Sequence, residues 1–123
     1  MKKILKFSFI LFFLISSSCV SKNGLYVDVK NMSDNVIYDV SVFTTDKKVF
    51  VEFGDIKSKE DEEMFLDMSN TMKSDGGYMI KFKTKNGIEY GTGGGYYTNG
   101  GAIDRKIVFI IKNDTVLVDI PLF

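Results

Sequence analysis

The sequence predicts an all-β fold, a single antiparallel β-sandwich of seven or eight strands over residues 24–123. Three observations predict it. Apolar and polar residues alternate with a period of two along most of the chain after residue 24. Turn signals such as Asn86-Gly87 separate the alternating segments at short intervals. The single proline, Pro121, lies near the end of the chain, where it interrupts no central strand.

Three alternating segments open the domain. Valine, leucine and other apolar residues occupy every second position in residues 25–29, 36–42 and 49–53. Asparagine- and aspartate-rich turn signals at residues 31–35 and 46–47 separate these segments. We therefore expect three strands joined by short turns.

Residues 58–74 (SKEDEEMFLDMSNTMKS) fit two interpretations. Three methionines recur there at helical spacing, whereas residues 64–68 alternate as in a strand. Because Ser, Asn and Thr at positions 69–71 are poor residues for a helix interior, we expect a strand over residues 62–68. A helix is the alternative.

The second half of the domain contains two hairpin signals. Asn86-Gly87 follows an alternating segment at residues 78–82 and is the strongest of them. Asn113-Asp114 separates apolar segments at residues 107–111 and 116–120. These segments complete the expected sandwich.

Residues 91–101 (GTGGGYYTNGG) form an unusual glycine-rich stretch, and we expect a long connection between strands whose glycines supply positive φ angles. A phosphate-binding loop would need a following lysine and a helix, but Ala102-Ile103-Asp104 come next. Tyrosines on a pliable loop are typical of surfaces that recognise sugars or proteins. The candidate recognition residues are Tyr90, Tyr96, Tyr97, Thr98 and Asn99. A purely structural loop is the alternative.

The composition argues against an enzyme, a metal site and a cofactor. The chain has no histidine, the usual general base and the commonest metal ligand, and its one cysteine allows neither an internal disulfide nor a thiolate zinc cage. The acidic run at residues 60–63 lacks the spacing of a calcium loop. We expect a non-enzymatic protein that binds no metal and no cofactor.

The charge argues against nucleic-acid binding. Three of the 16 basic residues lie in the first 18 positions, which hold no acidic residue, so the remainder carries 13 basic against 16 acidic side chains, a net charge of −3. Nucleic-acid binding requires many Lys or Arg contacts to phosphate, and this acidic balance offers no such surface.

The first 18 residues have the three parts of a secretory signal. Lys2, Lys3 and Lys6 give a positive start, and Phe7–Ile15 is a short apolar run. Three serines precede Cys19. The apolar run is shorter than the roughly 20 residues of a membrane-spanning helix, so we expect a cleaved signal helix. An ordinary signal peptide and an uncleaved anchor are the alternatives.

Small residues directly before Cys19 resemble the lipobox of bacterial lipoproteins, although Ser16 stands where leucine is favoured. The resemblance implies that lipid is added to the Cys19 thiol and that the leader is cut before it. It divides the chain into a signal peptide (1–18), a short lipidated tether (19–23) and a β-sandwich (24–123). The protein would then be held on a membrane of the bacterial cell envelope, on its periplasmic or outer face.

The segments VDVKNMSDNVIYDVSVF and VEFGDIKSKEDEE are similar to those of small immunoglobulin-like domains in bacterial lipoproteins. The resemblance implies fold and no activity. The leading hypothesis is a membrane-anchored interaction domain with a protein partner in the cell envelope. The alternatives are an immunity or inhibitor lipoprotein that neutralises a periplasmic toxin or hydrolase, and a module that binds a glycan or small ligand.

Overall fold

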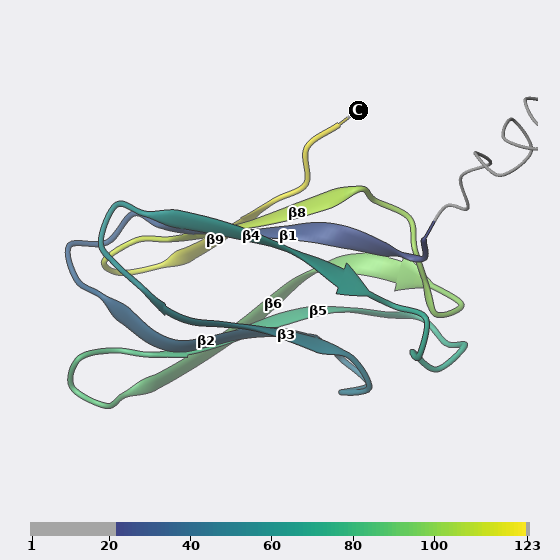
Figure 1. The fold of residues 1–123 in the computed structure, drawn as a ribbon, viewed down its shortest axis with the longest axis horizontal. Coiled ribbons are helices and arrows are strands. Elements are labelled where there is room, and N and C mark those ends of the chain that lie inside the picture. The colour runs from purple at the N-terminus through teal and green to yellow at the C-terminus, as the bar shows by residue number, and fades with distance from the viewer. Residues whose placement is uncertain (1–21, 123) are drawn as a thin grey trace, which may run out of the picture.

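The computed structural model describes residues 22–122, which form β-strands and no helix, in two sheets that pack face to face (Figure 1). The all-β sandwich predicted from the sequence is confirmed. One sheet has four strands in the order β4-β1-β8-β9, and the other has five in the order β3-β2-β5-β6-β7. The strands are β1 (Gly24–Asn31), β2 (Ile37–Thr44), β3 (Phe50–Ile56), β4 (Asp61–Asp67), β5 (Gly76–Lys83), β6 (Glu89–Thr98), β7 (Gly101–Ala102), β8 (Lys106–Ile111) and β9 (Val116–Asp119).

One strand pair departs from the expected antiparallel arrangement. β1 and β8 run parallel, with Val27 opposite Ile107, whereas every other pair of neighbouring strands is antiparallel. Local alternation sets the face of each strand but carries no information on the direction of its partner. The short β7 also brings the number of strands in residues 22–122 to nine, one more than expected.

The ambiguous segment after residue 58 is a strand, β4, as expected. β4 pairs with β1, and Leu66 lies opposite Leu25 with both side chains in the core. Met68 is buried just beyond the end of the strand, whereas Met72 is exposed on the following loop. The methionines therefore do not share a helical face.

The core lies between the sheets and is formed by alternate residues of most strands. Leu25, Val27 and Val29 of β1 and Ile107 and Phe109 of β8 face Val42, Ile80 and other apolar residues of the five-stranded sheet. Tyr78 and Tyr97 are both buried, and their ring centroids lie 5.6 Å apart. Burial of alternate positions explains why the sequence shows a period of two.

The glycine-rich stretch forms most of a strand, β6, so its interpretation as a long loop was wrong. β5 supplies a pairing partner from Glu89, opposite Lys83, to Tyr97, opposite Gly76. A side chain is excluded at Gly94 of this strand because a Cβ there would lie 2.9 Å from Val118. Tertiary packing has overridden the low strand propensity of glycine.

The turn that follows β6 uses left-handed backbone conformations. Asn99 and Gly100 have φ angles of 51° and 72°, and they join β6 to β7 as a two-residue hairpin. Positive φ at both central residues is typical of a type I′ turn, whose twist matches that of the flanking strands. Within the stretch from residue 91 to 101, Gly95 is the other residue with positive φ.

The two ends of the sandwich are different in character. At the end where β1 begins, called here the N-terminal end, the Asn23 amide nitrogen donates hydrogen bonds to the carbonyls of Met68 (3.2 Å) and Gly100 (3.0 Å), and its amide oxygen accepts one from the Ala102 N–H (3.1 Å). At the opposite end, called the distal end, lie the β1–β2 turn and the β5–β6 and β8–β9 hairpins, at the left in Figure 1.

The expected signal peptide lies outside the described residues, as do Cys19, Val20 and Ser21 of the expected tether. No helix in residues 22–122 is long and apolar enough to cross a membrane.

Candidate functional site

A groove of about 370 Å³ opens at the distal end, between the β5–β6 hairpin and the β8–β9 hairpin. The two sheets approach closely further along, where Gly94 of β6 meets Val118 of β9, and they diverge toward the hairpins. The groove is therefore the open side of the sandwich between the two sheets. Its volume lies within the usual range for sites that bind ligands.

The floor and one wall of the groove are apolar. The rings of Phe82 and Tyr90 stack with their centroids 5.9 Å apart. Tyr90 remains 50% exposed and Ile88 52% exposed, whereas Phe82 is buried beneath them. Ile111 and Val116 line the side that belongs to the four-stranded sheet. Exposed large apolar side chains beside a groove are a typical feature of binding sites.

The β5–β6 hairpin positions Ile88 and Tyr90 above the groove. The Thr84 N–H donates to the carbonyl of Ile88 and the Gly87 N–H donates to the carbonyl of Thr84, both at 2.9 Å. Gly87 has a φ of 77°, which this turn requires. The predicted Asn86-Gly87 hairpin is thus confirmed, and it brings the strand that follows it to the edge of the groove.

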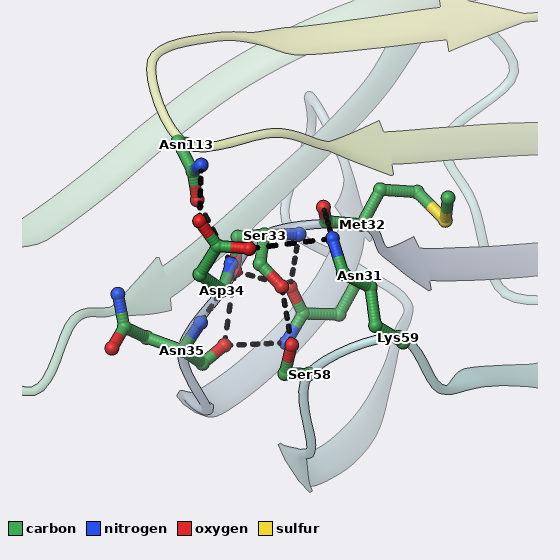
Figure 2. A network of polar contacts seen from close by, with 8 residues as sticks. All are labelled: Asn31, Met32, Ser33, Asp34, Asn35, Ser58, Lys59 and Asn113. Atoms are coloured by element: carbon green, nitrogen blue, oxygen red, sulfur yellow. Dashed lines mark hydrogen bonds and ion pairs between the residues drawn. The ribbon is translucent and has the colours of Figure 1, made fainter.

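A buried polar corner, drawn in Figure 2, supports the rim. Asn31 is fully buried at the end of β1, where its amide nitrogen donates to the carbonyls of Asn35 and Ile56, both at 2.9 Å. Its amide oxygen accepts from the N–H (3.1 Å) and the hydroxyl (2.6 Å) of Ser33. Because buried polar groups are costly unless they are paired, these bonds fix the β1–β2 turn.

Two further elements attach to the same turn. The Ser58 hydroxyl donates to the carbonyl of Ser33 at 2.5 Å, and the Lys59 ammonium donates to the carbonyl of Met32 at 2.8 Å. The Asn113 side chain reaches the turn from the β8–β9 hairpin (Figure 2). Three connections that are distant in sequence therefore support one side of the groove.

The predicted recognition residues do not form a single surface. Tyr90 lines the groove at the distal end. Tyr96 and Asn99 lie near the N-terminal end, where the Tyr96 hydroxyl (2.8 Å) and the Asn99 N–H (3.0 Å) both donate to Asp75. These two bonds hold the pKa of Asp75 below its usual range.

The remaining two predicted residues also differ in their surroundings. Tyr97 is fully buried in the core, so its assignment to a recognition surface was wrong. Thr98 is exposed where β6 turns into β7. A bulge in β6 near Gly95 shifts the alternation of the strand by one residue, so that Tyr97 faces the core and Tyr96 faces outward. Of the five predicted residues, Tyr90 is the one that the structure places in the groove.

A second hollow, of about 340 Å³, lies on the outer face of the five-stranded sheet. It forms where the register of β2 shifts around Val40, beside Asp39 with its φ of 52° and opposite Gly54 with its φ of 71°. Two exposed ion pairs cross this face, Lys81 with Glu89 (3.2 Å) and Lys83 with Asp39 (3.6 Å). Because four of the five charged residues that line it are already paired with each other, the hollow presents less to a ligand than the apolar groove does.

One acidic residue is buried on the outer face of the four-stranded sheet. Asp28 is 3% exposed, and its Oδ2 lies 3.8 Å from the Lys30 ammonium and 3.7 Å from that of Lys106. Its Oδ1 accepts no hydrogen bond from any residue in 22–122. Burial raises the pKa of Asp28, and the two lysines oppose that effect.

The donor groups in residues 22–122 do not gather into a metal site, since no group of three or more His, Cys, Asp or Glu side chains converges there. The groove can bind a partner through apolar contact and through hydrogen bonds from its rim. Asn86, Lys112 and Asn113 on the two hairpins supply polar groups around the apolar floor.

Comparisons with known proteins bear on the fold alone. No family model matches the chain, and no curated protein matches it. An NMR structure of a protein from Eubacterium rectale is similar, with a TM-score of 0.56 over 87% of this chain and 97% of that chain. The two sequences are 14% identical, so the likeness supports the sandwich and carries no function.

Proposed function

We propose that this protein is a lipoprotein of the bacterial cell envelope, anchored through lipid on Cys19, whose β-sandwich is a non-enzymatic binding domain. The groove at the distal end is the binding site in this proposal. The single observation that carries it is the position of the groove at the opposite end of the sandwich from Asn23, where the domain meets its tether.

The tether is short enough to set the orientation of the domain. Asn23 is fixed to the N-terminal end of the sandwich by three hydrogen bonds, and Cys19 lies four residues earlier. Four extended residues span at most about 14 Å. Acyl chains on Cys19 would therefore hold the N-terminal end close to the lipid surface and leave the groove facing away from it.

We propose further that the sandwich is of the immunoglobulin-like type. Its support is a pair of packed sheets within about 100 residues and a chain that passes repeatedly from one sheet to the other, as between β1 and β2 and between β3 and β4. Domains of this architecture present binding surfaces at the ends of the sandwich, where their turns gather.

Radioactive palmitate labelling in a lipoprotein-processing bacterium tests the anchor. The wild-type chain and Ser17→Ala, which keeps a small residue before the cysteine, should both incorporate label and sediment with membranes. Cys19→Ser should do neither. The anchor proposal fails if Cys19→Ser still incorporates label.

The orientation is tested with a fluorophore on a single new cysteine, attached to the acylated protein on vesicles. Tyr96→Cys places the dye near the N-terminal end, and Lys85→Cys places it at the distal end. A strand of eight residues separates the ends by about 26 Å. A quencher on the lipid headgroups should quench the dye at position 96 strongly and the dye at position 85 weakly. Equal quenching would contradict the orientation.

A further inference from the structure

We propose that the partner binds as an extended peptide segment that adds a strand to the edge of β6, with its alternate side chains in the groove. This inference deepens the proposed function and rests on it for the groove as the binding site. Strand addition is a common mode of peptide recognition, in which backbone hydrogen bonds supply affinity and pockets for alternate side chains supply specificity.

The outer edge of β6 is open along most of its length. β6 pairs with β5 on one side from Glu89 to Tyr97, but on its other side β7 covers only Tyr97 and Thr98. From Glu89 to Tyr96 no strand formed by residues 22–122 pairs with that edge. An open edge presents a row of backbone donors and acceptors to any chain that can align with it.

The hairpin shows which backbone groups point toward the open edge. The bond from the Thr84 N–H to the Ile88 carbonyl marks these two residues as a hydrogen-bonded pair of β5 and β6. In an antiparallel ladder such pairs alternate with non-hydrogen-bonded ones. Tyr90 and Thr92 therefore bond to β5, whereas the N–H and C=O groups of Glu89, Gly91 and Gly93 point outward from the edge.

Glycine occupies two of these three outward positions. A Cβ on Gly93 would lie 2.5 Å from the Met79 sulfur, so packing accounts for that glycine. A Cβ on Gly91 would meet nothing closer than the Ile80 carbonyl oxygen at 3.7 Å, and its φ is not positive. Neither packing nor backbone conformation requires glycine at position 91. A Cβ at this position would project from the outer face of the sheet, beside Lys81, and not along the edge, so alanine there leaves the outward N–H free for an added strand.

The edge also lacks the residues that usually protect one. Natural edge strands carry lysine or proline to prevent pairing with other chains, and β6 (EYGTGGGYYT) contains neither. Its single charged side chain, Glu89, is bound by Lys81 of β5 on the outer face of the sheet. The edge therefore lacks both a covering strand and the side chains that would prevent another strand from pairing with it.

The groove indicates the side chains that the added strand should carry. Tyr90 and Thr92 line the groove from β6, and Val116 lines it from β9. Every second side chain of an added strand would point toward these residues. Apolar side chains there would cover Tyr90 and Ile88, which are half exposed. We therefore expect a segment in which apolar and polar residues alternate.

A second copy of this chain is a poor occupant of the edge. Antiparallel pairing of two β6 edges creates a two-fold axis perpendicular to the strands, which points the two N-terminal ends in opposite directions. Both lipid anchors could then reach one bilayer only if the pair lay on its side, which is incompatible with the orientation proposed above, in which the groove faces away from the lipid. The favoured occupant is therefore a segment of a different protein.

The test uses the full-length chain in detergent micelles and a phage-displayed library of random nine-residue peptides. Enriched peptides are synthesised, and their affinities are measured for the wild type, Gly91→Pro and Gly91→Ala. Proline removes the outward N–H and leaves the bonds between β5 and β6 intact, whereas alanine keeps that N–H and fits the available space. Thermal melting verifies that both variants are folded.

We expect enriched peptides with alternating apolar residues, equal affinity for the wild type and Gly91→Ala, and at least about tenfold weaker binding to Gly91→Pro. Amide exchange at Gly91 and Gly93 should slow in the complex.

The proposal is overturned if folded Gly91→Pro binds as the wild type does, if these amides gain no protection, or if no peptide is enriched. It is also overturned if the wild type sediments as a dimer and Gly91→Pro as a monomer. Because the assay needs no bilayer, its outcome is separate from the fate of the lipid anchor.

Discussion

Asp34 and Asn113 exchange two hydrogen bonds across the distal end of the sandwich, although 79 residues separate them in the sequence (Figure 2). The Asp34 N–H donates to the Asn113 amide oxygen and the Asn113 amide nitrogen donates to the Asp34 carboxylate, both at 2.8 Å. This pair joins the β1–β2 turn to the β8–β9 hairpin. It therefore fixes the β8–β9 hairpin, which forms one side of the groove, to the β1–β2 turn.

Asn113→Ala should raise the pKa of Asp34. The hydrogen bond from Asn113, and to a lesser extent Lys59, holds the pKa of the Asp34 carboxyl below its ordinary value of 3.8. Loss of the amide donor destabilises the carboxylate form, so the pKa moves upward while Lys59 still opposes the full return. An NMR titration of the Asp34 side chain measures the shift.

Asn35→Ala is the control for that titration, because Figure 2 shows the Asn35 amide pointing away from Asp34. It should leave the pKa of Asp34 where it is in the wild type. An unchanged pKa in Asn113→Ala would contradict the role assigned to this bond.

Asn31→Ala should lower the free energy of unfolding by about 3 kcal/mol. The substitution leaves the carbonyls of Asn35 and Ile56 without the Asn31 donor, in a place where Asn31 is fully buried. Urea denaturation measures the change. Ser33→Ala, which removes one of the two donors to the Asn31 oxygen, should cost only about 1 kcal/mol. Equal losses for the two variants would count against Asn31 as the centre of this corner.

Tyr97→Ala and Tyr96→Ala should have very different effects although the residues are adjacent. Tyr97 is fully buried against Tyr78, so its truncation should lower the free energy of unfolding by about 3–5 kcal/mol. Tyr96 is exposed, and its truncation should change the melting temperature little. Thermal melts of the two variants give the comparison, and similar melting temperatures would show that the core is packed differently.

Asp28→Asn should stabilise the protein near neutral pH. Burial raises the pKa of Asp28 above its ordinary value of 3.8, so the folded state holds this proton more tightly than the unfolded chain does. The free energy of unfolding of the wild type consequently falls as the pH rises from the ordinary value through the raised one. Asparagine carries no charge, so the free energy of unfolding of the variant does not fall in this way as the pH rises.

Thermal melts at several pH values test this expectation. The difference in melting temperature between Asp28→Asn and the wild type should be positive at about pH 7 and should narrow below the ordinary pKa of aspartate. Asp39→Asn is the control, since it changes an exposed acid that also lies beside a lysine and exposed pairs contribute little. A lower melting temperature for Asp28→Asn than for the wild type at neutral pH would contradict the predicted stabilisation.

The strands that could be predicted are those whose burial leaves a local pattern. Leu25, Val27 and Val29 are buried between the sheets while their neighbours face outward, so β1 is visible in the sequence. β4 could be predicted because residues 69–71 are unfavourable in a helix. The β5–β6 hairpin could be predicted because Gly87 of the Asn86-Gly87 signal supplies a positive φ that few other residues adopt.

β6 could not be predicted, because glycine contributes no alternation and disfavours strands when it is judged locally. Its conformation is set by partners distant in the sequence, such as Val118, which leaves no room for a side chain at Gly94. For the same reason Tyr96 and Tyr97 look equivalent in the sequence, although one is exposed and the other is in the core.

The groove was missed for a different reason. Ile88 and Tyr90 both follow the Asn86-Gly87 hairpin signal, and apolar residues beside a turn were the one available indication of the site. The β8–β9 hairpin lies opposite Ile88 and Tyr90 because of the order of the strands in the two sheets. Strand order, like the parallel pairing of β1 with β8, arises from long-range pairing that local patterns do not encode.

The parallel pairing of β1 with β8 has a consequence for the order of folding. β1 obtains one of its two neighbours, β8, from a segment far along the chain, with Val27 opposite Ile107. Pairings between segments so far apart in sequence form slowly, because the intervening chain must be closed into a loop first. The four-stranded sheet therefore cannot assemble until β8 is available to pair with β1. The core of the sandwich is completed only when β1 and β8 have paired, although the hairpins of the five-stranded sheet can form from local contacts.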